Sequence, residues 1–485
     1  MRLNQFLITL ALIFLFSESL LSQRNTITFP IEMSNPKYFS ILRNSIGEWG
    51  VFMKDERSYH FLLVDKEGNI LKKKILNRRD EKTAESKKFL GGMSRPEGFY
   101  FFFKDTENEY VNDYSSYFLS KENEEDVHYK LPPLTVGENE SIINTFSVNN
   151  TFYFIAIDKK LNKVSFLSFF DERQFEKHSF TLEKELLKIF LKEDFRVVKN
   201  PQSSLLVTLK AFNKLYVEEK QFYFVIDNNI QNRDFGNGKI FHFNLNNNTF
   251  NYHYLPGTGV GDVSNSCFTD ERIVRFVRGA DKIKFYFYDL KSQKIYKKLE
   301  YVAGDEIAIV PDFVVNQKQL IEYKGNVGSP ERNTAEIVEK KRHIFQSLSK
   351  GKPFIHVEKQ PNGTNCLLVG SYKEVKKGYN YHLPTATGTG TPYSPQIQPG
   401  VPVGSTEGTY MNANWFNALI DESFYNIIQT PAPIPNTIKV EEFIQRLKSS
   451  EAEERDIVLI RDGNKLFAAY RQYDNRIKIT EMDSY

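Results

Sequence analysis

A short unit of two alternating strands recurs along this chain and constrains its fold more than any other feature. In the stretch Lys239–Pro256, apolar and polar residues alternate on both sides of Asn247-Asn248. Alternation with a period of two is typical of a half-buried strand. Asn also tolerates the positive φ that a two-residue turn requires. The stretch therefore predicts a β-hairpin.

The predicted hairpin has one aromatic face and one polar face. A two-residue turn at Asn247-Asn248 places Phe243 opposite Tyr252 and Leu245 opposite Phe250. Cross-strand pairs of this kind are the unit that stabilises a sheet. We therefore expect the aromatic face to pack inside the protein.

Six further stretches share this two-strand design with different residues. They are Tyr59–Leu76, Tyr117–Leu131, Ser165–Leu182, Lys284–Leu299, Phe354–Tyr372 and Leu466–Met482. A propeller blade of four strands takes roughly 40–50 residues. The seven units favour an all-β fold, a β-propeller of seven blades with short helical insertions, and six or eight blades are the alternatives. A strand near Phe39 should close the ring beside the C-terminal strands, because an open propeller leaves sheet edges unpaired.

The N-terminal segment reads as an export signal. Residues 1–22 combine a positive residue, Arg2, with the apolar run Phe6–Phe16 and a cleavage site near Ser22. The apolar run is shorter than the roughly 20 residues that span a bilayer. We expect a cleaved signal peptide, no transmembrane segment, and a mature protein in the periplasm, on the outer surface or outside the cell. Residues 23–485 are predicted to form a single propeller domain.

Four stretches depart from the strand pattern. Apolar spacing predicts a short amphipathic helix over Thr181–Leu191. A Ser-Pro start predicts a helix over Ser329–Lys341, and a third helix is expected from Thr437 onward. The stretch Gly378–Thr409 is rich in Gly, Thr and Pro and has no hydrophobic period. It is predicted to be a flexible loop.

Charge and cysteine content narrow the classes of partner. The chain has 64 basic and 61 acidic side chains. This balance predicts no nucleic-acid partner. The two cysteines, Cys267 and Cys366, fall in different predicted blades. Export permits a disulfide between them, but two separately buried thiols are favoured.

A resemblance covers roughly the last quarter of the chain. The run Gly370–Val375, the Gly/Pro-rich loop and the stretch Tyr410–Asp421 follow one another in a characteristic layout. This layout resembles that of exported bacterial β-propeller-like proteins of unknown function. The resemblance implies a propeller fold and carries over no functional residues.

No catalytic or cofactor motif stands out. There is no G-x-S-x-G elbow for a serine hydrolase and no H-E-x-x-H pair for zinc. A glycosidase needs two placed carboxylates, and Asp113, Asp171 and Asp289 cannot be told apart from ordinary turn acids. The sequence therefore predicts no catalytic residue and no cofactor, and leans toward a non-enzyme.

One candidate metal pair follows from the predicted hairpin register. The two-residue turn places His242 directly opposite His253 on the polar face. Cross-strand Cβ atoms lie about 4.5–5.5 Å apart, so two imidazoles there are candidate zinc or copper ligands. The favoured interpretation is that both are polar residues on a solvated or inter-blade face, so the sequence predicts no metal site and keeps the pair as candidates only.

Three functions stay open at this point. The favoured hypothesis is an exported propeller that binds a peptide, a glycan or a partner protein. The alternatives are a propeller glycoside hydrolase and a structural component of the cell envelope. Clustered carboxylates at the mouth of the central channel favour the hydrolase, and a wide exposed apolar patch favours the structural component.

Overall fold

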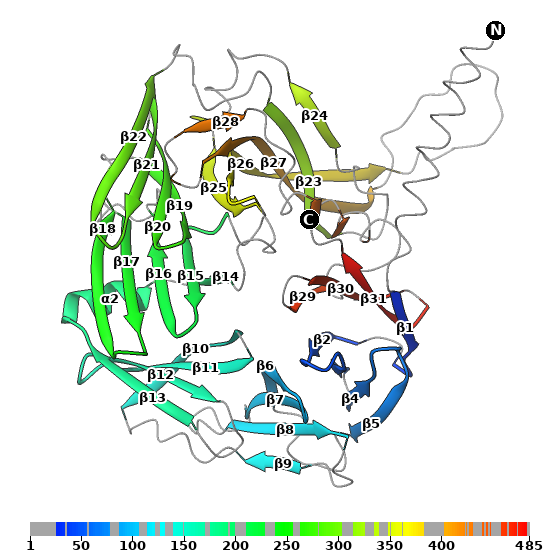
Figure 1. Cartoon of the computed structure of the whole chain (residues 1–485). Coiled ribbons are helices and arrows are strands. Elements are labelled where there is room, and N and C mark those ends of the chain that lie inside the picture. The colour runs from blue at the N-terminus through cyan, green and yellow to red at the C-terminus, as the bar shows by residue number, and fades with distance from the viewer. Residues whose placement is uncertain are drawn as a thin grey trace, which may run out of the picture.

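The computed structural model is almost entirely β-structure. It describes residues 26–482 except for 34–35, 56–57, 78–86, 106–113, 122–126, 131–138, 149, 170–174, 193–194, 199–209, 228–237, 256–261, 280, 303–313, 325–333, 339–347, 350, 361, 383–401, 422, 424–425, 430–438, 441–442, 445–446, 448–456, 463–464 and 473. The predicted signal peptide, residues 1–22, lies outside this range. Figure 1 shows the strands gathered into sheets that follow one another around a ring.

The described residues form seven sheets, which we number 1–7 in chain order. Sheets 1, 2, 3 and 5 are antiparallel and four-stranded, and neighbouring strands follow one another in the chain. Sheet 1 contains β2 (Tyr38–Arg43), β3 (Trp49–Lys54), β4 (Ser58–Val64) and β5 (Ile70–Asn77). Sheet 2 contains β6 (Lys87–Arg95), β7 (Gly98–Asp105), β8 (Tyr114–Ser120) and β9 (Val127–Lys130). Sheet 3 contains β10 (Glu140–Val148), β11 (Thr151–Asp158), β12 (Lys163–Phe169) and β13 (Phe175–Thr181), and sheet 5 contains β19 (Val263–Thr269), β20 (Arg272–Arg278), β21 (Lys282–Asp289) and β22 (Lys294–Val302).

Sheet 4 has a fifth strand. It contains β14 (Arg196–Val198), β15 (Asn213–Glu218), β16 (Gln221–Ile226), β17 (Gly238–Asn244) and β18 (Thr249–Leu255). β14 pairs with β15 in the parallel direction, and the other pairs are antiparallel. The helix α2 (Lys184–Lys192) precedes β14 and confirms the helix predicted over Thr181–Leu191. Its Leu187 and Phe190 are buried among residues of sheets 3 and 4.

Sheet 6 is built in a different order from the others. Its strands are β23 (Val314–Lys324), β24 (Thr334–Val338), β25 (Lys352–Lys359), β26 (Asn365–His382), β27 (Pro402–Ile420) and β28 (Ile427–Gln429). The spatial order is β24-β23-β27-β26-β25, and β28 pairs with the end of β27. The chain thus forms the two strands at one edge of the sheet, β23 and β24, before it forms β25 at the opposite edge.

Two predictions fail in sheet 6. The helix predicted over Ser329–Lys341 contains the strand β24, because pairing with β23 overrides the local helix-start signal. The predicted loop Gly378–Thr409 is wrong at both ends, since Gly378 lies opposite Glu407 in a long β26–β27 ladder. Backbone pairing needs no hydrophobic period, which is why the sequence pattern missed it. Residues 383–401 lie outside the described part of the chain.

Sheet 7 closes the ring with both ends of the described chain. It contains β29 (Ile457–Asp462), β30 (Lys465–Arg471), β31 (Arg476–Met482) and the N-terminal strand β1 (Thr26–Pro30). β1 pairs antiparallel with β31, so that Thr28 lies opposite Lys478. The prediction that a strand near Phe39 closes the ring is wrong, because Phe39 belongs to β2 of sheet 1. Before sheet 7, residues 439–440, 443–444 and 447 are helical, within the third predicted helix.

The hydrophobic core lies between successive sheets. Each large cluster of buried side chains combines residues of two neighbouring sheets, such as Phe52 with Phe101 for sheets 1 and 2. Similar clusters join sheets 2 and 3, 3 and 4, 4 and 5, 5 and 6, and 7 and 1. Antiparallel sheets that pack face to face around a ring define a β-propeller. The predicted all-β propeller is confirmed, whereas the number of blades stays a prediction because parts of the chain are not described.

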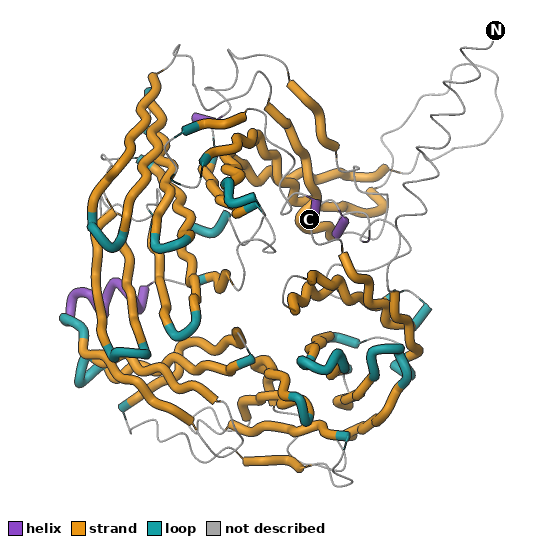
Figure 2. The backbone as a smooth tube through the Cα atoms, viewed as in Figure 1, coloured by secondary structure: helices purple, strands orange, loops and turns teal. Residues whose placement is uncertain are grey.

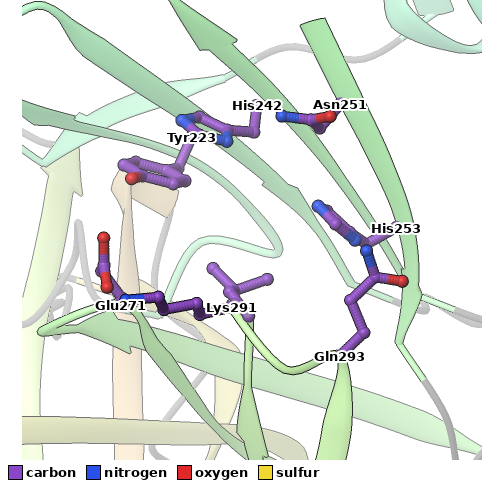
Figure 3. A pocket seen from close by; sticks show the side chains of 8 residues that line it. Tyr223, His242, Asn251, His253, Glu271, Lys291 and Gln293 are labelled. Carbon is purple, nitrogen blue, oxygen red and sulfur yellow. The ribbon is translucent and has the colours of Figure 1, made fainter.

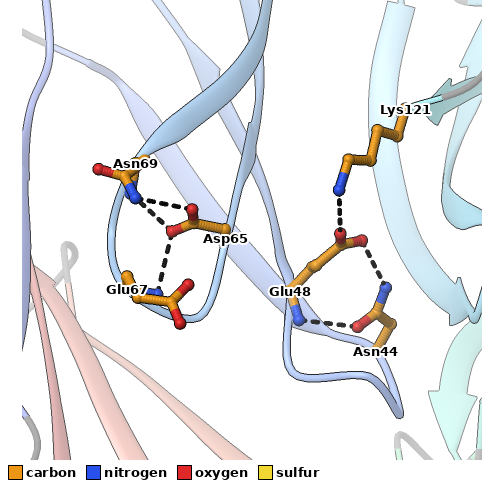
Figure 4. Close-up of polar contacts among 6 residues, drawn as sticks. All are labelled: Asn44, Glu48, Asp65, Glu67, Asn69 and Lys121. Carbon is orange, nitrogen blue, oxygen red and sulfur yellow. Dashed lines mark hydrogen bonds and ion pairs between the residues drawn. The ribbon is translucent and has the colours of Figure 1, made fainter.

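Figure 2 shows short turns between neighbouring strands in several sheets. In the β4–β5 turn, Oδ1 of Asp65 accepts hydrogen bonds from the backbone N–H groups of Glu67 and Asn69, at 3.0 and 2.7 Å. Gly68 adopts a φ of +98° there, which favours glycine. In the β2–β3 turn, Oδ1 of Asn44 accepts from the N–H of Glu48 at 2.8 Å (Figure 4). These bonds hold the hairpin geometry that the sequence units predicted.

Two further features agree with or extend the sequence analysis. Cys267 of β19 and Cys366 of β26 are both buried and free, which confirms two separate thiols. Among the described residues, the structure contains no helix with the length and apolar character needed to cross a membrane.

Candidate functional site

A pocket of about 280 Å³ lies between sheets 4 and 5. Sheet 4 contributes side chains from β16, β17 and β18, and sheet 5 contributes side chains from its β19–β20 and β21–β22 turns (Figure 3). The lining residues are Tyr223, His242, Asn251, His253, Glu271, Leu290, Lys291 and Gln293. The pocket therefore contains both histidines that the sequence singled out.

The register of the β17–β18 hairpin differs from the prediction by two residues. Asn244 pairs with Thr249, so the connection has four residues rather than two. Oδ1 of Asn244 accepts a hydrogen bond from the N–H of Asn246 at 2.9 Å, which stabilises the longer turn. Asn248 takes the positive φ, 54°. The sequence could not distinguish the two turns because the run of asparagines suits both.

The corrected register changes how the two histidines are related. His242 lies opposite Asn251, and His253 lies opposite Ile240. Direct opposition of the two histidines is therefore wrong. They still share one face of the sheet, because a shift of two residues preserves the face. They are diagonal neighbours on that face, and both line the pocket.

His242 is held in place by aromatic stacking. Its ring lies 4.3 Å from the ring of Tyr223, with an interplanar angle of 9°. The ring of Tyr223 stacks in turn on Phe268 of sheet 5, at 4.1 Å and 26°. The stack joins the two sheets and fixes the orientation of the imidazole.

One amide oxygen organises the polar side of this stack. Oε1 of Gln221 accepts a hydrogen bond from Tyr223 Oη at 3.0 Å and lies 3.0 Å from Nε2 of His242. Nδ2 of Asn244 also donates to it, at 3.3 Å. Because an amide oxygen only accepts, neutral His242 must carry its hydrogen on Nε2. Its Nδ1 then carries a lone pair.

Both imidazoles of the pocket are neutral at neutral pH. Burial, together with the neighbouring His253, lowers the pKa of His242 to about 4. Burial also lowers the pKa of His253 below its ordinary value. Desolvation disfavours the charged form of a base, which explains the direction of both shifts.

Carboxylates gather beside the pocket. Burial, the largest cause, and the charges of Asp270, Glu271 and Glu219 together raise the pKa of Glu218 to about 7. Glu218 pairs in the β15–β16 ladder with Gln221, the residue whose amide oxygen contacts His242. Asp270 and Glu271 form a two-residue turn with φ of 47° and 58°. This turn directs Glu271 to the pocket lining.

The carboxylates suggested from sequence do not form this group. Asp113 and Asp171 lie outside the described residues. Asp289 caps its own turn, since its Oδ1 accepts from the N–H of Ser292 at 2.6 Å. Glu218 and Glu271 were missed because neither belongs to a recognisable motif. They meet only when sheets 4 and 5 pack together.

A serine–histidine contact elsewhere is not a catalytic arrangement. Oγ of Ser58 lies 2.8 Å from Nε2 of His60. Asp55, however, accepts hydrogen bonds from Ser58 at 3.1 Å. In a catalytic triad the carboxylate orients the histidine. Here the carboxylate of Asp55 binds the serine, so we interpret these residues as polar groups that stabilise the β3–β4 turn.

A buried charged cluster lies on the same interface as the pocket. Nζ of Lys214 donates to Oδ1 of Asn265 and to the carbonyl oxygen of Ser266, both at 2.8 Å. Asp227 accepts from the N–H of Ser266 at 2.6 Å. Burial lowers the pKa of Lys214 to about 8. Because the described pocket is not lined by these residues, the cluster is best understood as a polar link between sheets 4 and 5.

The candidate metal pair acquires no third ligand of the usual kinds. In the described part of the chain, no three His, Cys, Asp or Glu side chains come close enough to hold a metal together. The sequence favours no metal site and leaves His242 and His253 as candidates only, and this stays a prediction.

Comparisons with known proteins give only distant similarities. The chain matches no family model and no curated protein sequence. Among solved structures it is similar to the Dos1 propeller, with 9% identity, 93% of each chain covered and a TM-score of 0.30. It is also similar to the β-propeller domain of the trilobed protease from Pyrococcus furiosus, with 10% identity, 69% of this chain and 90% of that chain covered, and a TM-score of 0.29.

A third similarity is to a structure from a study of two prolyl endopeptidases. The identity is 8%, the TM-score is 0.31, and the match covers 70% of this chain and 48% of that chain. The chain thus matches about half of the length of that protein. At TM-scores near 0.3, these likenesses carry no activity over to this chain. The fold assignment rests on the sheets and their ring.

Proposed function

We propose that this protein is an exported, non-enzymatic binding propeller that holds one residue of a glycan in the pocket between sheets 4 and 5. The observation that carries the proposal is the lining of the pocket. Two neutral imidazoles, the amides of Asn251 and Gln293, and the charged groups of Glu271 and Lys291 face one small volume. Export rests on the signal-like residues 1–22.

The lining suits a ligand that is polar all around. Imidazole, amide, carboxylate and ammonium groups supply both donors and acceptors, which sugar hydroxyls need. Leu290 and the ring of Tyr223 add apolar surface for the carbon skeleton. Pockets for drug-sized ligands measure about 300–1,000 Å³, so a pocket of about 280 Å³ suits a single small unit. A peptide or a partner protein would use a wider surface.

The test is a glycan array probed with the mature protein, followed by titration of each hit. We expect Asn251→Ala and Gln293→Ala to weaken binding of the same glycan, because each removes a lining amide. Asn247→Ala is the matched control, since this amide lies in the exposed β17–β18 turn outside the pocket lining. A hit that both lining variants bind like the wild type would place the glycan elsewhere. Binding only to a peptide array would overturn the glycan class.

A glycoside hydrolase is the second candidate, favoured by one observation. Glu218 has a pKa of about 7 beside the carboxylates of Asp270 and Glu271. A protonated acid next to an ionised carboxylate is the pairing that glycosidases use. Hydrolysis of a panel of aryl glycosides tests this candidate. Turnover that is lost in both Glu218→Gln and Glu271→Gln would replace the binding proposal.

Export and a structural role are tested separately. The mature protein is expected outside the cytoplasm with its N-terminus near Gln23, which N-terminal sequencing checks. A start at Met1 in a cytoplasmic pool would overturn the export proposal. A pull-down from envelope extract tests the structural alternative. An envelope protein that co-purifies in stoichiometric amount and is not displaced by excess glycan would support a structural component.

A further inference from the structure

The diagonal relation of His242 and His253 brings two imidazoles into one pocket. Diagonal neighbours on a sheet face lie about 7–8 Å apart at their Cα atoms, and somewhat closer at Cβ. Both side chains line the same small volume, His242 from β17 and His253 from β18 (Figure 3). Metal–nitrogen bonds of imidazole measure about 2.0–2.1 Å. Two imidazoles on one sheet face that line one pocket are therefore the candidate ligands of a single ion.

His242 has the outer contacts that a metal-binding histidine needs. Its Nε2 lies 3.0 Å from the amide oxygen of Gln221, which leaves the Nδ1 lone pair available. Metal-binding histidines usually donate their other ring N–H to an oxygen in this way, which fixes the tautomer and orients the ring. The stack on Tyr223 further limits rotation of the ring.

The charges around the pair favour a cation. Both imidazoles are half-buried and lie in a pocket that the carboxylate of Glu271 also lines. Glu218 and Asp270 stand beside Glu271, and Asp270 pairs with Lys359 at 3.1 Å. Lys291 is the opposing positive charge of the lining, on an exposed side chain.

We propose that His242 and His253 together bind one divalent first-row transition-metal ion in this pocket, with water in the remaining coordination positions. Nitrogen ligands of this kind favour Cu²⁺ over Zn²⁺ and Ni²⁺. Since the protein supplies two ligands, the site is open, and the ion keeps positions for an exogenous ligand. This site goes beyond glycan binding and does not depend on it.

The experiment is a titration of the metal-free mature protein with CuCl₂ in a non-coordinating buffer. We expect one equivalent to bind with an electron paramagnetic resonance signal split by two imidazole nitrogens. His242→Gln and His253→Gln should each remove the two-nitrogen signal. His178→Gln is the matched control, since His178 lies in sheet 3 beside Glu176 and should leave the signal unchanged. Circular dichroism melting confirms that each variant is folded.

One further variant separates a built site from surface histidines. Gln221→Leu should weaken Cu²⁺ binding roughly 10–100-fold without removing a ligand, as loss of an outer partner does. A two-nitrogen signal that survives in either histidine variant overturns the proposal. So does an unchanged Cu²⁺ affinity in Gln221→Leu. Glycan binding, measured with and without EDTA, tests the proposed function separately from the metal site.

Discussion

A Cβ atom on Gly238 would lie 1.9 Å from Nη1 of Arg275. Arg275 extends from sheet 5 and is fully buried against this glycine of sheet 4, where its Nη2 donates to Oγ of Ser264 at 2.9 Å. The guanidinium thus occupies the space that any other residue at position 238 would need. The absence of one side chain allows the two sheets to pack around a buried cation.

Gly238→Ala is therefore expected to destabilise the protein by about 1–3 kcal/mol, the usual cost of overpacking a core. Urea unfolding measures the change in the free energy of unfolding. In a double-mutant cycle, Arg275→Met should reduce the cost of Gly238→Ala, because the shorter side chain leaves room. Additive effects in that cycle would contradict the steric explanation.

Lys214→Met tests the buried charged cluster. The change removes the ammonium donor from Asn265 Oδ1 and Ser266 O, and it removes one of two cations that act on Asp227, the other being Arg275. Breaking a buried charge pair by removing one partner costs about 3–5 kcal/mol. Chemical denaturation at pH 7 checks this loss. An unchanged midpoint would mean that the cluster is not a link between the sheets.

The same lysine predicts a pH dependence with a definite sign. Burial lowers the pKa of Lys214 from its ordinary value of 10.5 in the unfolded chain to about 8 in the folded protein. Between these values the unfolded chain binds a proton that the folded chain does not, so stability from this group rises with pH. The stability difference between the wild type and Lys214→Met should widen from pH 8 to pH 10. A constant difference across that window would contradict the low pKa.

Glu218→Gln should stabilise the protein at pH 8 and leave it unchanged near pH 4.5. Burial raises the pKa of Glu218 from its ordinary value of 4.5 to about 7 in the folded protein. Above pH 7 the folded protein must hold a half-buried carboxylate, and a glutamine avoids that cost. Thermal melting at both pH values measures the effect. Glu219→Gln, a change at an exposed side chain, should alter the melting temperature much less. An equal gain in melting temperature at both pH values for Glu218→Gln would refute the explanation.

Phe29→Ala tests how the ring closes. Phe29 of β1 is 1% exposed and packs with Phe467, Ile477 and Ile479. Loss of a buried phenylalanine costs about 3–5 kcal/mol, and here it also weakens the pairing of β1 with β31. Thr28→Ala is the matched control on the same strand, because Thr28 is exposed. Equal stability of the two variants would show that β1 does not hold the ring closed.

The sequence supported some elements better than others, for reasons visible in single residues. Alternation around the β17–β18 hairpin predicts two strands and their buried face correctly. It places the cross-strand register two residues off, because the two strands are joined by four residues rather than two and Asn244 caps this longer connection. The run of asparagines suits a turn of either length. The face survives that error since strand periodicity is two. The helix expected at Ser329 contains a strand, since pairing with β23 outweighs a local capping signal.

Local patterning by itself determined the all-β propeller and the short helix near Leu187. These follow from alternation, helical spacing and residue type along a continuous stretch. Only the tertiary structure decided the pocket, the acid group around Glu218 and the closing strand β1. Their members come from separate strands and turns, from Tyr223 to Gln293 in the pocket. Such groups exist only after the burial of apolar faces has packed one sheet against the next, and that packing has no signature along the chain.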